Sequence, residues 1–232
     1  MDDTKDSYFK FIVVFLLFLL LAFDRDLALI YLLILVGDYF WYKSDSFISF
    51  KIKRQGSSLI KVVLETLAAL GLFLGASTVL INIVSPQTLV ASGFIKEAQS
   101  IFHLLATGTP ILQGSKILTL VGWGVLVPIV ETTFFNGRLL EGLAHYSEKV
   151  FGTKVRLDKV TPKLFLVILV VASLFTLFHI TAKGLNSLPL LITFIFSIIS
   201  SLLVIRHQEL RGAIYLHVIV NSMAVLSSFG WI

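Results

Sequence analysis

Long apolar stretches, separated by short segments that carry most of the charges, dominate this chain. Its mean hydropathy is +0.92, and 14% of its residues are Asp, Glu, Lys or Arg, against about a quarter in ordinary soluble domains. Lipid offers no water to the backbone, so an apolar stretch of about 20 residues spans it as a helix. The sequence therefore predicts an all-α fold, a polytopic transmembrane helical bundle.

The apolar stretches predict about seven spans, at residues 8–23, 27–42, 59–84, 117–135, 164–182, 188–205 and 213–231. The first two are short for a span, and no small-x-small cleavage site follows the first, so we expect a retained helical hairpin. Segments 94–105 and 139–151 mix apolar and charged residues at helical spacing and are expected to lie in the interface. We expect one integral membrane domain over 1–232, with 1–112 lacking a motif and 113–232 carrying the functional residues.

The basic residues predict the orientation in the membrane. They gather in three segments, at 43–61, at 149–163 and at Arg206 with Arg211, which the positive-inside rule places in the cytoplasm. We expect a multi-pass cell-membrane protein with its N-terminus inside and its C-terminus outside. The net charge of +5 is then explained by attraction to anionic headgroups of membrane lipid, and no nucleic-acid partner is expected. The chain has no cysteine, which excludes disulfides and thiolate chemistry.

Polar side chains interrupt three of the later spans: Glu131, His179, and His217 with Asn221. An ionisable group at membrane depth costs at least a few kcal/mol unless it faces a protein interior or a water-filled cavity, so such residues are functional candidates. Phe175 precedes His179 by four residues, and Asn221 follows His217 by four, so each pair shares a helix face.

Each candidate also has a structural interpretation. Glu131 would pair with Arg138 near the cytoplasmic surface, His179 would be a satisfied core histidine, and His217 with Asn221 would join helices by hydrogen bonds. The remaining ionisable groups in or beside the spans are expected to be structural (Asp38, and Glu65 one turn from Lys61) or solvated (His103, His145 and His207).

Taken together, a Glu, then F-x-x-x-H, then H-x-x-x-N, each on a separate late span, resembles the CPBP family of intramembrane endopeptidases. This is the CAAX protease and bacteriocin-processing type, which includes the Ras-converting enzymes. The resemblance covers roughly residues 113–231. In the family's first motif, E-E-x-x-x-R, Glu131 matches the first Glu, whereas Thr132 and Asn136 stand where the second Glu and the Arg are expected. Joint replacement of a buried ion pair by neutral groups can be nearly neutral.

The resemblance implies hydrolysis of a peptide bond in a membrane-anchored or lipidated peptide. Glu131 and His179 would activate a water, and His217 with Asn221 would stabilise the oxyanion, with Phe175, Asn136 and Arg138 in support. No cofactor is expected. As an alternative, Glu131, His179 and His217 would bind zinc, since two His and one Glu form a known catalytic ligand set; the absence of H-E-x-x-H spacing ranks this second.

Two other functions compete. The departures at Thr132 and Asn136 favour a catalytically inactive CPBP-like protein that binds a partner helix or a lipidated tail. A small transporter or channel would use the same buried charges, but neither internal repeats nor broken helices support it.

The candidate residues are predicted to lie at different depths in the membrane, which conflicts with a single shared site. At 1.5 Å per residue, Glu131 and His217 lie roughly 10 Å from the basic loops, and His179 about 24 Å from Lys163. We expect the last four spans to surround an intramembrane cavity. The depths would then be reconciled by a fourth helix that runs longer and tilts through 139–144, by a fifth that begins deeper, or by a kink at Pro128.

Overall fold

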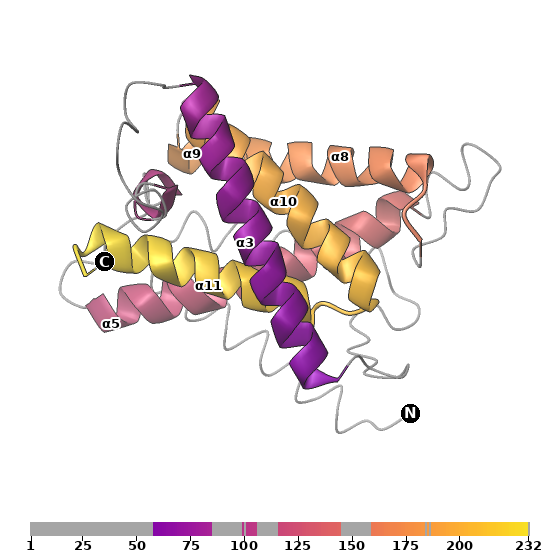
Figure 1. Cartoon of the computed structure of the whole chain (residues 1–232), viewed down its shortest axis with the longest axis horizontal. Coiled ribbons are helices and arrows are strands. Elements are labelled where there is room, and N and C mark those ends of the chain that lie inside the picture. Colours follow the sequence, from indigo (N-terminus) through magenta and orange to yellow (C-terminus); the bar gives the residue numbers. More distant parts are fainter. Residues whose placement is uncertain are drawn as a thin grey trace.

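A computed structural model describes residues 58–84, 99, 101–105, 116–144, 159–183, 185 and 187–231 (Figure 1). All regular secondary structure in these ranges is helical, which confirms the predicted all-α class. The predicted spans 8–23 and 27–42 lie outside the described residues.

The helices, in chain order, are α3 (Leu59–Val84), α5 (Lys116–Thr119), η1 (Leu120–Leu126), α6 (Val127–Glu131), η2 (Thr132–Leu139), α8 (Pro162–Phe178), α9 (Ile180–Lys183), α10 (Ser187–His207) and α11 (Arg211–Ser228). Residues 101–105 are also helical. Segments α5 to η2 follow one another without a break and form one helix that continues to Ala144, in which η1 and η2 have the wider π-helical turn.

Three of the described helices are long and apolar enough to cross a membrane: Leu59–Val84, Lys116–Ala144 and Ser187–His207. Helix α8 is apolar but has 17 residues. The described part of the chain therefore supports a membrane protein with three candidate spans, and the predicted number of about seven is not confirmed.

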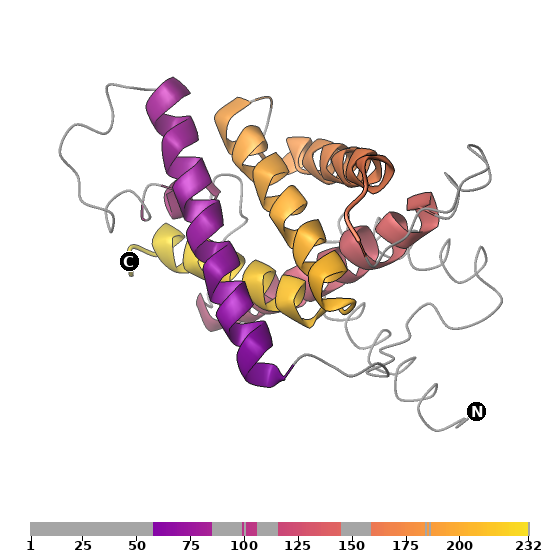
Figure 2. The ribbon, with the colours of Figure 1, turned by 45° about the vertical axis from the view of Figure 1, so that its right-hand side comes forward.

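Helix α10 lies between α3 and α8, and α11 crosses beside α3 and α10 (Figures 1 and 2). Aromatic residues pack where these helices meet, with the rings of Phe73 and Phe196 edge to face at 5.6 Å between centroids. The outer face of α3 exposes large apolar side chains, among them Ile60 and Ile83. Such exposure suits contact with lipid, because soluble domains rarely expose so large an apolar surface to water.

The fifth predicted span, 164–182, is interrupted in the structure. Helix α8 begins at a capped N-terminus, where the Thr161 hydroxyl accepts a hydrogen bond from the Leu164 N–H at 3.2 Å and Pro162 occupies the first turn. Helix α8 ends at His179, where the side chain rather than the backbone N–H bonds to the carbonyl of Phe175. The distance from Nδ1 to this oxygen is 2.8 Å. The His179 N–H bonds instead to the Thr176 carbonyl at 3.0 Å. This competition between side chain and backbone ends α8 before the short helix α9.

One expected solvated residue is buried. The His207 side chain is 0% exposed, and its Nε2 lies 3.1 Å from Oε2 of Glu65. Arg206 reaches the other oxygen of Glu65, with 3.5 Å between Nη2 and Oε1. The prediction that His207 is solvated is therefore wrong, because α3 and α10 pack side by side at this end and enclose the imidazole. The structural interpretation of Glu65 holds, although with partners on α10.

Candidate functional site

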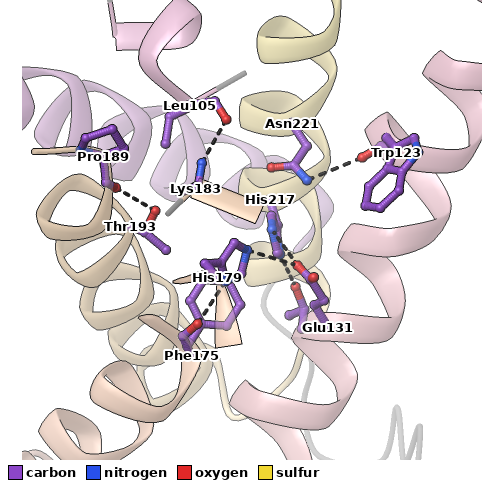
Figure 3. A network of polar contacts seen from close by, with 11 residues as sticks. Leu105, Trp123, Glu131, Phe175, His179, Lys183, Pro189, Thr193, His217 and Asn221 are labelled. Carbon is purple, nitrogen blue, oxygen red and sulfur yellow. Dashed lines mark hydrogen bonds and ion pairs between the residues drawn. The ribbon is translucent and has the colours of Figure 1, made fainter. Parts of the chain in front are cut away.

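The structure brings together three of the four predicted catalytic residues. Glu131 ends α6, His179 follows α8 and His217 lies in α11. Oε2 of Glu131 lies 3.5 Å from Nε2 of His217 and 3.9 Å from Nε2 of His179. Figure 3 shows the three side chains turned toward one another. Because Glu131 is 4% and His217 2% exposed, the three polar groups meet in the protein interior rather than in lipid.

The depth mismatch between Glu131 and His179 is largely removed by the length of the fourth helix. This helix runs to Ala144, past the predicted end at residue 135 and through the first residues of the segment expected to be interfacial. Counted from Ala144, Glu131 lies about 20 Å along the helix, and His179 lies about 25 Å from Pro162. For these two residues the structure thus agrees with the first of the three expected explanations, whereas His217 lies about 9 Å from the start of α11 at Arg211.

The hydrogen bond that ends α8 also defines the protonation of His179. A carbonyl oxygen only accepts, so Nδ1 of His179 must donate to Phe175. In the neutral ring, Nε2 is then an unprotonated acceptor. It is this acceptor that faces Glu131.

The Phe175 ring touches both histidines. Its centroid lies 4.4 Å from the His179 ring and 5.8 Å from the His217 ring. On the other side of His217, the Phe196 ring lies at 4.8 Å. These aromatic contacts restrict the orientation of the two imidazole rings.

The two residues that depart from the family motif are buried and hydrogen-bonded. Oγ1 of Thr132 lies 2.9 Å from Nδ1 of His217. Asn136 donates through Nδ2 to Oγ of Ser201 at 2.9 Å and accepts from Ser200 at 3.4 Å. Thr132 and Asn136 are thus joined to α11 and α10 respectively, which leaves no buried charge at either position. The side chain of Arg138, the other supporting residue, lies outside the described set.

Asn221 contacts a backbone carbonyl on the fourth helix. Its Nδ2 donates to the Trp123 oxygen at 3.3 Å (Figure 3), and the neighbouring Ser222 hydroxyl donates to the Gly124 oxygen at 3.1 Å. Pro128 has no N–H, which deprives the Gly124 carbonyl of its donor in α-helical spacing and the Trp123 carbonyl in π-helical spacing. Pro128 thus leaves one of these two carbonyls without a backbone donor, and α11 supplies a side-chain donor to each of them.

Several residues of this network were not predicted from the sequence. Ser200, Ser201 and Ser222 lie in apolar helices, where a hydroxyl is a weak signal because it can bond to its own helix backbone. Lys183 also belongs here: its Nζ donates to the Leu105 carbonyl at 2.8 Å, close to the histidines in Figure 3. The i, i+4 spacing of His179 and Lys183 was available in the sequence as a signal.

The zinc alternative receives no support. Within the described ranges, no group of three His, Cys, Asp or Glu side chains is placed so that it could hold a metal ion.

Fold and site together define a helical membrane protein with a buried acid and two imidazoles. The family described as type II CAAX prenyl endopeptidase Rce1-like matches residues 113–223, just under half of the chain, and this segment includes every motif residue from Glu131 to Asn221. The match over these residues confirms the predicted resemblance to the CPBP family. At the level of the family, the match implies a membrane peptidase of the CAAX type. No curated protein and no solved structure matches the chain significantly.

Proposed function

We propose that this protein is an intramembrane endopeptidase that hydrolyses a peptide bond in a membrane-anchored or lipidated peptide. The observation that carries the proposal is the approach of two imidazole Nε2 atoms to one oxygen of a buried carboxylate, Glu131. The three residues come from three helices of the segment that matches the endopeptidase family.

Glu131 and His179 are suited to hold the attacking water. The Glu131 oxygen and the unprotonated Nε2 of His179 are both acceptors, and at 3.9 Å they are too far apart for a direct hydrogen bond. A water between them donates one O–H to each. As the water oxygen bonds to the peptide carbonyl carbon, one of these groups takes its proton, and returns it to the leaving nitrogen when the C–N bond breaks.

His217 and Asn221 are proposed to stabilise the oxyanion that forms on the carbonyl oxygen. They lie four residues apart on α11 and so share a face. The Asn221 amide has two N–H donors, of which one is held by Trp123, and the second remains for the oxyanion. Each aligned donor contributes about 3 to 4 kcal/mol to such a step.

The membrane is proposed to deliver the substrate. The three candidate spans and the exposed apolar surface of α3 support delivery of a lipid-anchored peptide from the bilayer. The positive-inside pattern places the N-terminus in the cytoplasm. Lipid and the peptide are the proposed partners.

The direct test is cleavage of a prenylated reporter peptide with a C-terminal CAAX sequence by the full chain in lipid vesicles. Glu131→Gln keeps the shape of the side chain but removes the base, and it should abolish cleavage with an unchanged yield of folded protein. Glu141→Gln, an exposed site on the same helix, should cleave normally. Full activity in Glu131→Gln would remove Glu131 from the mechanism.

The second candidate, an inactive protein that holds a lipidated tail, is favoured by the neutral pair Thr132 and Asn136. It requires the unaltered chain to bind the prenylated reporter without turnover. Under the enzyme proposal, bound reporter is cleaved, so binding and product formation measured on one sample separate the two.

A further inference from the structure

Both ring nitrogens of His217 have defined neighbours. Nε2 faces Oε2 of Glu131 at 3.5 Å, and Nδ1 lies 2.9 Å from Oγ1 of Thr132. His217 is 2% exposed and Thr132 0%, so bulk water does not compete for either nitrogen. A neutral imidazole has one donor nitrogen and one acceptor nitrogen, and the neighbours of His217 determine which of the two carries the proton.

The selection follows from what each neighbour can do. An ionised Glu131 only accepts, so a protonated Nε2 of His217 is attracted to it, whereas an unprotonated Nε2 would place two acceptors face to face. With the proton on Nε2, Nδ1 is an acceptor. The group beside Nδ1 must then be a donor, and the hydroxyl of Thr132 can donate.

The orientation of Thr132 supports this direction. A threonine hydroxyl in a helix commonly donates to the carbonyl four residues earlier, and the adjacent Thr133 does so, at 2.7 Å from the Ile129 oxygen. The Thr132 hydroxyl instead reaches across to α11. The hydroxyl of Thr133 therefore bonds to its own helix backbone, whereas that of the adjacent Thr132 bonds to His217.

We propose that Thr132 is a positioning residue: it donates its hydroxyl to Nδ1 of His217 and holds that ring as the Nε2–H tautomer. His179 has the opposite tautomer, because its Nδ1 donates to Phe175. The two imidazoles thus present opposite functions to Glu131, an acceptor from His179 and a donor from His217. An ionised Glu in place of Thr132 would accept from Nδ1 and leave Nε2 unprotonated.

The catalytic meaning of this arrangement rests on the proposed endopeptidase function, since a protonated Nε2 is what an oxyanion requires of His217. The arrangement itself does not depend on turnover. It can be measured on the resting protein.

The test is nitrogen NMR of the full chain in lipid nanodiscs with ¹⁵N-labelled histidine, in which protonated and unprotonated ring nitrogens give separate signals. His217 is assigned by the loss of its signals in His217→Gln, and His179 likewise in His179→Gln. We expect His217 protonated at Nε2 and His179 protonated at Nδ1. Thr132→Val, which keeps the side-chain shape, should shift His217 toward the Nδ1–H form, whereas Thr132→Ser should keep the original tautomer.

Thr133→Val is the matched control, with one hydroxyl lost at the next position and His217 unchanged. A His217 ring protonated at Nδ1 in the unaltered protein, or one that keeps its tautomer in Thr132→Val, would overturn the proposal.

Activity adds a second measurement. In the reporter assay, Thr132→Val should lower kcat about tenfold with KM unchanged, the effect of one misdirected hydrogen bond, and Thr132→Ser should restore it. If Glu131→Gln still cleaves while the tautomers are as stated, the proposed function fails and the role of Thr132 stands. If Glu131→Gln is inactive and the His217 tautomer is the same in Thr132→Val as in the unaltered protein, the proposed function stands and the role of Thr132 fails.

Discussion

Asn221 donates a hydrogen bond to the backbone carbonyl of Trp123, with 3.3 Å between Nδ2 and the oxygen. The contact joins α11 to the fourth helix at the turn where Pro128 leaves a carbonyl without a helical donor. The same helix contains His217, one turn before Asn221. One face of α11 therefore both donates a hydrogen bond to the fourth helix near Pro128 and holds the His217 imidazole beside Glu131.

Restoring the missing backbone donor should make the side-chain donors of α11 less important. In the unaltered protein, Ser222→Ala should lower the free energy of unfolding by about 1 kcal/mol, because the Gly124 carbonyl loses its donor. In a Pro128→Ala background the regained N–H offers that carbonyl an α-helical partner, so the same change should cost less. Thermal unfolding of all four variants in one detergent measures the coupling. Equal costs in both backgrounds would show that Ser222 does not compensate for Pro128.

Gly124 should be required for the close approach of α11. A Cβ at this position would lie 3.0 Å from Oγ and 3.3 Å from Cα of Ser222, and the second of these atoms is backbone that cannot rotate away. Gly124→Ala should therefore destabilise the fold by about 1 to 3 kcal/mol and weaken cleavage through the displaced His217.

Gly71→Ala is the matched control for this change, because nothing lies within 4 Å of a Cβ there. Alanine is the better helix former by about 1 kcal/mol, so Gly71→Ala should be neutral or stabilising. Thermal unfolding and reporter cleavage of both variants give the comparison. A stable, active Gly124→Ala would mean that the two helices can separate at no cost.

The sequence was sufficient to predict the helical class, because the length of an apolar run is a local signal. The apolar run 59–84 coincides with α3, and three of the four candidate residues, Glu131, His179 and His217, lie close together. The helix breaks and partners could not be predicted. The end of α8 at His179 depends on one side-chain hydrogen bond, and the partners of Asn136 lie on α10, which only the three-dimensional packing brings near.

Glu65 and His207 should tie α3 to α10 without taking part in the chemistry. Their atoms approach to 3.1 Å with the His207 side chain fully enclosed, so removing one partner strands a polar group. His207→Leu or Glu65→Leu should each lower the free energy of unfolding by about 1 to 3 kcal/mol. The double variant should recover part of that loss, because no enclosed member of the pair remains and Arg206, the other partner of Glu65, is largely exposed.

Unfolding midpoints measure this pair, and the reporter assay per folded molecule gives the control, with little change in any of the three variants. A double variant as unstable as the sum of the singles would show that the two residues act independently.

Thr132 and Asn136 should behave as a unit when the charged pair of the family motif is introduced. Thr132→Glu alone would bury a carboxylate at a fully enclosed position, and Asn136→Arg alone would bury a guanidinium between Ser200 and Ser201. Each should lower the free energy of unfolding by about 3 kcal/mol or more, since hydrogen bonds to neutral neighbours do not compensate for a buried charge without a counter-ion. One helical turn separates the two positions, so the double variant allows an ion pair and should be more stable than the sum of the single changes predicts. Unfolding of the two single variants and the double variant in one detergent gives the coupling free energy. An additive result would mean that the enclosed space cannot accommodate the ion pair. The packing of α10 and α11 around the two neutral residues would then differ from a packing that holds the charged pair.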